Sequence, residues 1–393
     1  MMKVLLSLFL IFGLLGLRIY GIDAFQCHHQ TVADEKARPF RRRRVRLQQG
    51  TSPPSVQHKT IAIVGTGAVG GFYGAKLWEA GYNVKFQMRG DNLQTSMTEG
   101  FQVTSIDGNI FIPPYELSAF EHPEECGPVD WVIVALKSSS LHAIPELILP
   151  LLDPQRTRIL VIMNGLIEED LIHALKEHTG EDNTSVDSNL KCCAALYAGM
   201  ALICANRIAP AHVDHSYAGL LNGGLAASNP YCTADDNKQA YLDLWQPTSV
   251  TVDYEDSVLA GRWRKCLWNL PFNGISVAMG GITVDKIVLD PALRKLAYQV
   301  MAETIAAGNA DLTMHNEPKE VFLCDDDKHR MMDLSDKMGP YRTSTMLDFV
   351  EGRPMEVKYL FTKPVERAQK LGIPVPRLET LVAQIEALER LRQ

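Results

Sequence analysis

The stretch TIAIVGTGAVGGFYGAKLWEAGYNVKFQM, residues 60–88, decides the fold of this chain. Its first five residues are apolar or β-branched, which is typical of a strand buried on both faces. A glycine-rich turn follows, and then FYGAKLWEAG (72–81), which predicts a helix that ends at its last glycine. NVKFQM (83–88) predicts a second strand. A G-x-G-x-x-G turn alone is weak evidence, but between a strand and a helix it predicts a dinucleotide-binding βαβ unit.

Each glycine of this turn has a physical purpose. We expect Gly65 to allow the tight turn, Gly67 to let the backbone approach a pyrophosphate, and Gly70 to let the helix pack closely on the strand. The N-terminus of the helix would then face the phosphates. The residues expected to contact the cofactor are Gly65, Thr66, Gly67, Ala68, Val69 and Gly70. The alternative is an ordinary glycine turn of an α/β protein.

The residue after the second strand selects the cofactor. An acidic side chain at this position would accept hydrogen bonds from the ribose hydroxyls of NAD, but the chain carries Arg89 here. A guanidinium group suits a 2′-phosphate, so the sequence favours NADPH. The alternative is a solvated surface arginine.

Two later apolar runs predict further strands, DWVIVAL (130–136) and RILVIM (158–163). Lys137 follows the first and Asn164-Gly165 follows the second. Ligands of open parallel sheets bind outside the carboxyl ends of the strands, which makes both positions candidates. We expect Lys137 to support the cofactor phosphate and Asn164 to contact the cofactor ribose or the substrate. Each residue is equally well explained as part of a turn.

From about residue 256 the pattern becomes helical, and GRWRKCLWNLPFN (261–273) is its informative part. Lys265, Asn269 and Asn273 are spaced i, i+4 and i+8, which places them on one helix face. Among large apolar neighbours, one cation and two amides predict a polar active-site surface. The alternative is a solvated face. Pro271 is expected to interrupt or kink the helix.

Charge divides the chain unevenly. The net charge is −7, yet residues 1–60 hold ten Lys or Arg against three Asp or Glu, which leaves the remainder strongly acidic. An acidic body argues against a nucleic-acid partner. No cluster of His, Cys and acidic residues has metal-ligand spacing, so no metal is expected. We expect a small-molecule substrate, and the sequence leaves open whether the protein is a homodimer.

The pattern of residues 1–58 predicts a targeting leader. Lys3 precedes about 14 apolar residues, which suits a signal peptide better than a membrane span. A polar, basic segment with four consecutive arginines, Arg41–Arg44, follows. We expect a bipartite leader that directs the protein to a plastid; the alternatives are a secretory signal and a signal anchor. The expected divisions are residues 1–24 (signal peptide), 25–58 (basic presequence), 59–254 (cofactor domain) and 255–393 (helical substrate and catalytic domain).

Together these motifs resemble the ketopantoate reductase (2-dehydropantoate 2-reductase) family over about residues 59–391. The glycine turn, Arg89, Lys137 and Asn164-Gly165 match its cofactor half, and K-x-x-x-N-x-x-x-N at 265–273 matches its catalytic helix. Ser344, followed by Met346-Leu347-Asp348 and, twelve residues on, by Glu356, matches the remaining signature. The resemblance implies an α/β Rossmann-type N-terminal domain and an all-α C-terminal domain like that of 6-phosphogluconate dehydrogenase, with the site between them.

The resemblance also implies residue roles. Lys265 would be the general acid in the NADPH-dependent reduction of 2-dehydropantoate to pantoate, a step of pantothenate and coenzyme A biosynthesis. Glu356 would contact the nicotinamide ribose or order the site, although a carboxylate in a first helical turn is also explained by the helix dipole. The residues implied to bind substrate are Asn164, Asn269, Asn273 and Ser344.

Two positions depart from the family pattern. Met163 replaces the glutamine that usually precedes Asn-Gly, and Thr283 stands where some members carry another substrate-binding asparagine. The second difference leaves open a different 2-oxo acid as substrate. An alternative from another class is a non-catalytic NADPH-binding sensor, but such a protein would have no need of the helical motif.

Overall fold

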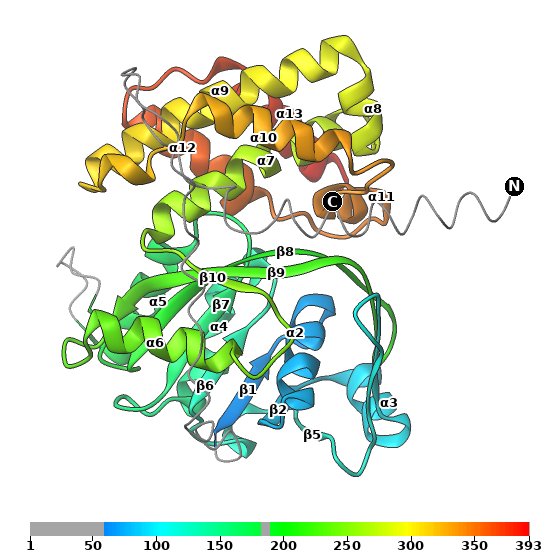
Figure 1. The fold of residues 1–393 in the computed structure, drawn as a ribbon, viewed down its shortest axis with the longest axis vertical. Coiled ribbons are helices and arrows are strands. Elements are labelled where there is room, and N and C mark those ends of the chain that lie inside the picture. The colour runs from blue at the N-terminus through cyan, green and yellow to red at the C-terminus, as the bar shows by residue number, and fades with distance from the viewer. Residues whose placement is uncertain (1–58, 182–188, 393) are drawn as a thin grey trace, which may run out of the picture.

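The computed structural model describes residues 59–181 and 189–392. The expected leader, residues 1–58, lies outside them. Within the described ranges, none of the helices combines the length and the apolar character needed to cross a membrane. The chain forms a sheet-based half below and a helical half above, as Figure 1 shows. The expected fold class, a Rossmann-like α/β part followed by an all-α part, is therefore confirmed.

The first half is built on one sheet with the order β4-β3-β9-β8-β7-β6-β1-β2-β5, in which β10 also pairs with β9. Strands β2, β1, β6, β7 and β8 are mutually parallel neighbours, as a dinucleotide-binding unit requires. The strands are β1 (Thr60–Val64), β2 (Asn83–Gln87), β3 (Phe101–Ser105), β4 (Ile110–Ile112), β5 (Ser118–Phe120), β6 (Trp131–Val134), β7 (Arg158–Ile162), β8 (Ala195–Ala209), β9 (His212–Ser228) and β10 (Val252–Tyr254).

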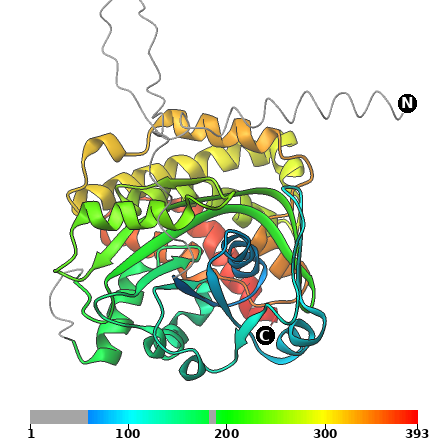
Figure 2. The ribbon, with the colours of Figure 1, turned by 60° about the horizontal axis from the view of Figure 1, so that its bottom comes forward.

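Strands β8 and β9 form a long antiparallel hairpin. In Figure 2 these two green strands arch over the blue helix α2 (Ala68–Glu79), which packs against both of them. The sheet therefore curls around α2 instead of remaining open. Register shifts at four places along the hairpin allow this curvature.

Short and long helices flank the sheet. On the sheet side they are α2, α3 (Gly90–Glu99), α4 (Ile144–Ile148), α5 (Glu168–Thr179), α6 (Ala234–Trp245) and the 3₁₀ segments η2 (Pro123–Glu125), η3 (Ser138–Ala143) and η4 (Leu149–Leu151). Helix α2 ends at Glu79, two residues before the expected glycine. The apolar side chains of the sheet fall into two buried clusters.

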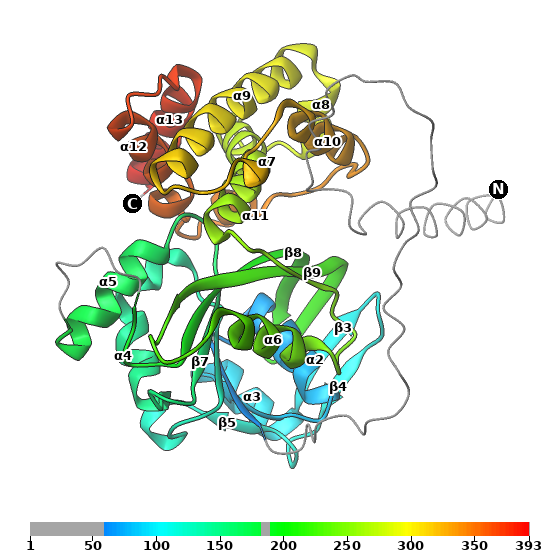
Figure 3. The ribbon, with the colours of Figure 1, turned by 60° about the vertical axis from the view of Figure 1, so that its left-hand side comes forward.

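The helical half has a separate core around α7 and α9, and Figure 3 shows it as a layer above the sheet. Gly308 of α9 lies directly against Trp263 of α7, where an added Cβ would be 3.1 Å from the indole. The elements are α7 (Val258–Ala278), α8 (Val284–Leu289), α9 (Pro291–Met314), η5 (Lys319–Val321), α10 (Asp325–Asp336), α11 (Ser344–Val350), the π-helical η6 (Lys358–Thr362), α12 (Lys363–Lys370) and α13 (Pro376–Arg392).

Helix α7 differs from the expectation in one respect. Pro271 lies inside it, but the helix runs without a break from Val258 to Ala278. Burial of nearly all side chains around the proline supplies enough packing to hold the helix together where one backbone hydrogen bond is lost. The expected interruption is therefore wrong, and Lys265, Asn269 and Asn273 share one continuous helix.

Candidate active site

The glycine turn between β1 and α2 has the geometry that its spacing predicted. Gly65 has a φ of +91°, and a Cβ there would lie 2.6 Å from the Leu136 side chain. A Cβ on Gly70 would lie 2.3 Å from the Gly65 carbonyl oxygen. A Cβ on Gly67, in contrast, would meet nothing within 4 Å. Gly65 and Gly70 are thus required by the protein's own packing, whereas Gly67 leaves open space beside the first turn of α2.

Thr66 joins this turn to the end of β2. Its hydroxyl donates to the Gln87 carbonyl oxygen at 2.8 Å, and Asn92 of α3 donates to the Thr66 carbonyl at 3.4 Å. Arg89 is the residue before α3, with extended backbone and an exposed side chain. Ala68 and Val69 begin α2 and are partly exposed. The turn and the solvated guanidinium therefore lie at the same edge of the sheet.

Lys137 follows β6, and the structure pairs it with the helical half. Its ammonium lies 2.8 Å from a carboxylate oxygen of Asp348 in α11 and donates to the Pro354 carbonyl at 3.3 Å. Asp348 is nearly buried and also accepts a 2.9 Å bond from Arg353. The expectation that Lys137 supports a cofactor phosphate therefore competes with an ion pair that sequence reasoning missed. Asp348 carried a signal: it lies one turn after Ser344 on the same helix.

Glu356 connects both halves. One carboxylate oxygen accepts from the backbone N–H of Ser138 at 2.6 Å, and the other accepts from Asn164 Nδ2 at 3.5 Å. The helical residues that follow begin only at Val357. Glu356 therefore lies directly before its helix and not, as expected, in its first turn. Instead it binds the first N–H of η3, a donor that a helix start leaves unpaired.

The Asn164-Gly165 turn after β7 lies against η6. Gly165 has a φ of +88°, and a Cβ there would lie 2.4 Å from the Tyr359 carbonyl oxygen. The same oxygen accepts from the Leu166 N–H at 3.1 Å. Only glycine allows this approach of the two backbones. The turn thereby holds Asn164 beside Glu356.

The polar face of α7 is confirmed as a geometric unit. Asn273 donates to the Asn269 side-chain oxygen at 3.3 Å, and its own oxygen accepts from the Thr345 N–H at 3.0 Å. Both asparagines are buried. The Lys265 ammonium donates to the Ala201 carbonyl of β8. Lys265 therefore lies against the sheet and Asn273 against α11, and burial of both asparagines excludes the solvated-face alternative.

Lys265 has a perturbed proton affinity. Burial and, secondly, the positive charge of Arg262 lower the pKa of its ammonium to about 8, while the carboxylate of Glu356 acts in the opposite direction. Its side chain nevertheless retains some solvent exposure. An ammonium that loses its proton near neutrality is suited to act as a general acid.

The side chains of Ser344 and Thr283 lie apart from the hydrogen bonds of the polar face of α7. Ser344 opens α11 with an exposed side chain, and it is the neighbouring Thr345 backbone that contacts Asn273. The Thr283 hydroxyl bonds to Asp285 in the first turn of α8. Among the described residues, neither hydroxyl is hydrogen-bonded to Lys265, Asn269 or Asn273.

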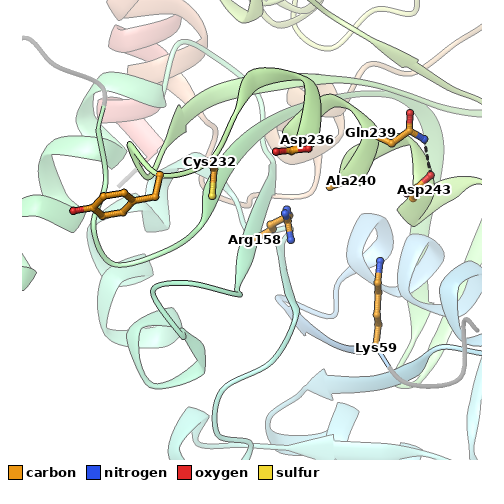
Figure 4. A pocket seen from close by; sticks show the side chains of 8 residues that line it. Lys59, Arg158, Cys232, Asp236, Gln239, Ala240 and Asp243 are labelled. Carbon is orange, nitrogen blue, oxygen red and sulfur yellow. Dashed lines mark hydrogen bonds between the residues drawn. The ribbon is translucent and has the colours of Figure 1, made fainter. Parts of the chain in front are cut away.

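A cavity of about 420 Å³ lies away from these residues, at the edge where β1 and β7 begin. Figure 4 shows Arg158 at its centre with Lys59 beside it. The expected site residues lie at or beyond the opposite, carboxyl ends of the same strands, so this cavity is separate from them. Its lining is Lys59, Arg158, Tyr231, Cys232, Asp236, Gln239, Ala240 and Asp243.

Both halves of the chain match models of the same protein family. Residues 61–227 match the family model described as ketopantoate reductase PanE/ApbA, and residues 257–389 match the model of its C-terminal part. A 2-dehydropantoate 2-reductase of Nostoc sp. is 30% identical over 336 residues, which cover 85% of this chain and 96% of that protein. One from Mesorhizobium japonicum is 27% identical, with 84% and 97% covered.

A solved structure also resembles this chain over nearly its whole length. The crystal structure of 2-dehydropantoate 2-reductase from Geobacter metallireducens is 32% identical and has a TM-score of 0.71, with 84% of this chain and 99% of that chain covered. The match includes the cofactor half and the helical half together. On the strength of both family models and of these near full-length relatives, the chain belongs to the ketopantoate reductase family.

Proposed function

We propose that this protein reduces a 2-oxo acid with NADPH, and that its substrate is 2-dehydropantoate, which becomes pantoate. The observation that carries the proposal is Lys265: an ammonium with a pKa lowered to about 8, next to two buried asparagines on one helix face. The names of the relatives, 2-dehydropantoate 2-reductase, support the choice of substrate.

The residues fit a nicotinamide dinucleotide. Open space beside Gly67 and the start of α2 would take the pyrophosphate, and Arg89 would pair with a 2′-phosphate. Glu356 and Asn164 lie at the carboxyl edge of the strands, where the nicotinamide ribose would bind. When bound, the cofactor supplies the hydride.

The chain's own residues supply the proton and the orientation. Lys265 donates a proton to the C2 oxygen of the substrate as the carbonyl carbon accepts hydride, so the ammonium becomes a neutral amine and the oxygen a hydroxyl. Before transfer, the cation stabilises the negative charge that develops on that oxygen. Asn269 and Asn273 bind the substrate's polar groups, and the hydrogen bond between them keeps both amides in place. Ser344 of α11 would also bind the substrate.

Two measurements test this proposal. Residues 59–393 should consume NADPH with 2-dehydropantoate faster than with smaller or aromatic 2-oxo acids. Lys265→Ala should lower kcat by about 10²- to 10⁴-fold while the Kd for NADPH stays nearly unchanged. A variant with normal turnover would show that the proton comes from elsewhere. Binding of NADPH with no turnover of any 2-oxo acid would favour the sensor alternative.

The leader carries a separate proposal. We infer that residues 1–58 direct the protein to a plastid and are absent from the mature enzyme, because an apolar signal segment is followed by a basic one. A fluorescent protein fused to residues 1–60 should enter the plastid. Secretion of the fusion would favour a plain signal peptide, and retention at a membrane would favour a signal anchor.

A further inference from the structure

Arg262 is a buried cation that the proposed reaction does not use. It lies in α7 one turn before Lys265, and only 1% of it is exposed. Burying a guanidinium is unfavourable unless charged and polar partners surround it. Its partners therefore indicate what the structure gains from placing it there.

Those partners lie on both sides of the Asn164 turn. Arg262 Nη1 donates to the Met163 carbonyl at 2.5 Å, directly before Asn164. Its Nε and Nη2 donate to one carboxylate oxygen of Glu168 at 2.8 and 2.6 Å, at the start of α5. The planar guanidinium thus spans the connection from β7 to α5 and joins both of its ends to the helix that carries Lys265.

We propose that Arg262 is a positioning residue of the active site, which holds the Asn164 turn in register with Lys265. The inference rests on the proposed function of Lys265 and Asn164. Without Arg262, Glu356 and the Tyr359 backbone still contact the turn, but both belong to a different segment of the helical half. Among the contacts with the turn that are described above, only those made by Arg262 come from α7 itself.

The charge of Arg262 also acts on Lys265. Residues three apart on a helix are neighbours, and a nearby like charge favours the neutral amine. The other charged group that acts on Lys265 is Glu356, and Glu168 faces Arg262 from α5. Cys266, adjacent in α7, has its pKa raised by burial to about 12 and is therefore an uncharged thiol. Removing Arg262 should consequently raise the proton affinity of Lys265.

Arg264 provides a matched control within the same helix. It is also nearly buried, and it is paired with Glu255 at 2.9 Å and with the Val321 carbonyl at 3.1 Å. These partners lie away from the Asn164 turn. Arg264→Met therefore removes a buried, ion-paired arginine from α7 without touching the contact under test.

The experiment compares Arg262→Met, Arg262→Lys and Arg264→Met in residues 59–393. The first readout is kcat/KM for the 2-oxo acid, measured against pH. The second is the pH dependence of acetylation of Lys265, followed by peptide mass spectrometry, which requires no turnover. NADPH binding and thermal unfolding establish that each variant is folded. If Arg262→Met does not fold, the double variant Arg262→Met/Glu168→Gln removes the unpaired carboxylate as well.

We expect Arg262→Met to lower kcat/KM by at least about tenfold and to move the labelling midpoint of Lys265 upward by about one pH unit. Arg262→Lys should keep the wild-type midpoint, because the charge remains, but should stay slow, because one ammonium cannot span both partners. Arg264→Met should change neither quantity. Wild-type kcat/KM in Arg262→Met, an unchanged midpoint, or equal changes in the Arg264 control would each overturn the inference.

The two proposals fail in different ways. If the wild-type protein reduces no 2-oxo acid, the proposed function is wrong, but the labelling midpoints still report whether Arg262 controls Lys265. If the wild-type protein is active and the labelling midpoints of the Arg262 and Arg264 variants are alike, the proposed function stands and only the role of Arg262 is lost.

Discussion

Replacing Lys265 with methionine should stabilise the folded protein while it abolishes reduction. Lysine and methionine have similar apolar stems, so the change mainly removes a partly buried cation. The pKa of Lys265 is lowered from 10.5 to about 8 by burial and by Arg262, which means that folding disfavours the charged form. A site that destabilises the fold in this way is a known consequence of selection for activity.

The magnitude follows from the two pKa values. A pKa change from 10.5 to about 8 corresponds to about 3 kcal/mol against the charged form. Methionine also loses the hydrogen bond to the Ala201 carbonyl, which removes about 1 kcal/mol. The expected net gain at pH 7 is therefore about 2 kcal/mol. For a protein of this size that is an increase in Tm of about 3 °C.

The pH dependence has a definite sign. Because the folded pKa is the lower one, the unfolded chain binds more protons between pH 8 and 10.5, and the stability of the wild-type protein rises with pH in that window. The methionine variant has no such group. The difference in Tm should therefore be full below pH 8 and should shrink as the pH approaches 10.5.

Differential scanning calorimetry of both proteins from pH 6 to 10 measures this difference, with cofactor absent so that binding does not contribute. The Tm of the wild-type protein is also measured with added salt, which shows how much of its pH dependence comes from surface charges. A lower Tm for Lys265→Met at pH 7, or a difference that does not change with pH, would refute the reasoning, because the lysine would then not be held in an unfavourable charged state.

Three further predictions concern the cofactor side of the site. Gly67→Ala should fold normally but raise the Kd for NADPH at least about tenfold, because its Cβ would enter open space that the cofactor needs. Gly70→Ala should instead lower Tm by several degrees, because its Cβ would lie 2.3 Å from a carbonyl oxygen. Fluorescence titration measures the first effect and calorimetry the second. Arg89→Ala should weaken binding of NADPH but not of NADH, and equal weakening in titrations would contradict a 2′-phosphate contact. Glu356→Gln should lower kcat more than it raises KM for NADPH in steady-state assays, because the amide accepts less strongly from Ser138; an unchanged kcat would remove Glu356 from the site.

Much of the cofactor half was predictable because its information is local. The roles of Gly65 and Gly70 follow from a turn whose contacts lie within a few residues or on the adjacent strand. The common face of Lys265, Asn269 and Asn273 follows from the helical period alone. The uninterrupted helix at Pro271 could not be foreseen, because the packing that stabilises it comes from the other helices.

The contacts that the sequence did not indicate join distant segments. The helix dipole was only the alternative explanation of Glu356, and neither interpretation named the backbone of Ser138, 218 residues away, from which its carboxylate accepts. Lys137 is expected to support a cofactor phosphate, and the sequence did not indicate its carboxylate partner, Asp348 of α11. Single side chains give no periodic signal for such pairs, since each residue also fits a surface turn or a helix end.

The sequence by itself determined the glycine turn of the βαβ unit, the polar face of α7 and the family, because periodicity and glycine spacing act over a few turns of chain. Only the tertiary structure decided that Lys265 lies against β8, that Arg262 joins α7 to the Asn164 turn, and that Glu356 and Asp348 connect the helical half to the sheet. These contacts depend on how the cores of the two halves meet, and the orientation of one core on the other is a property of their whole surfaces.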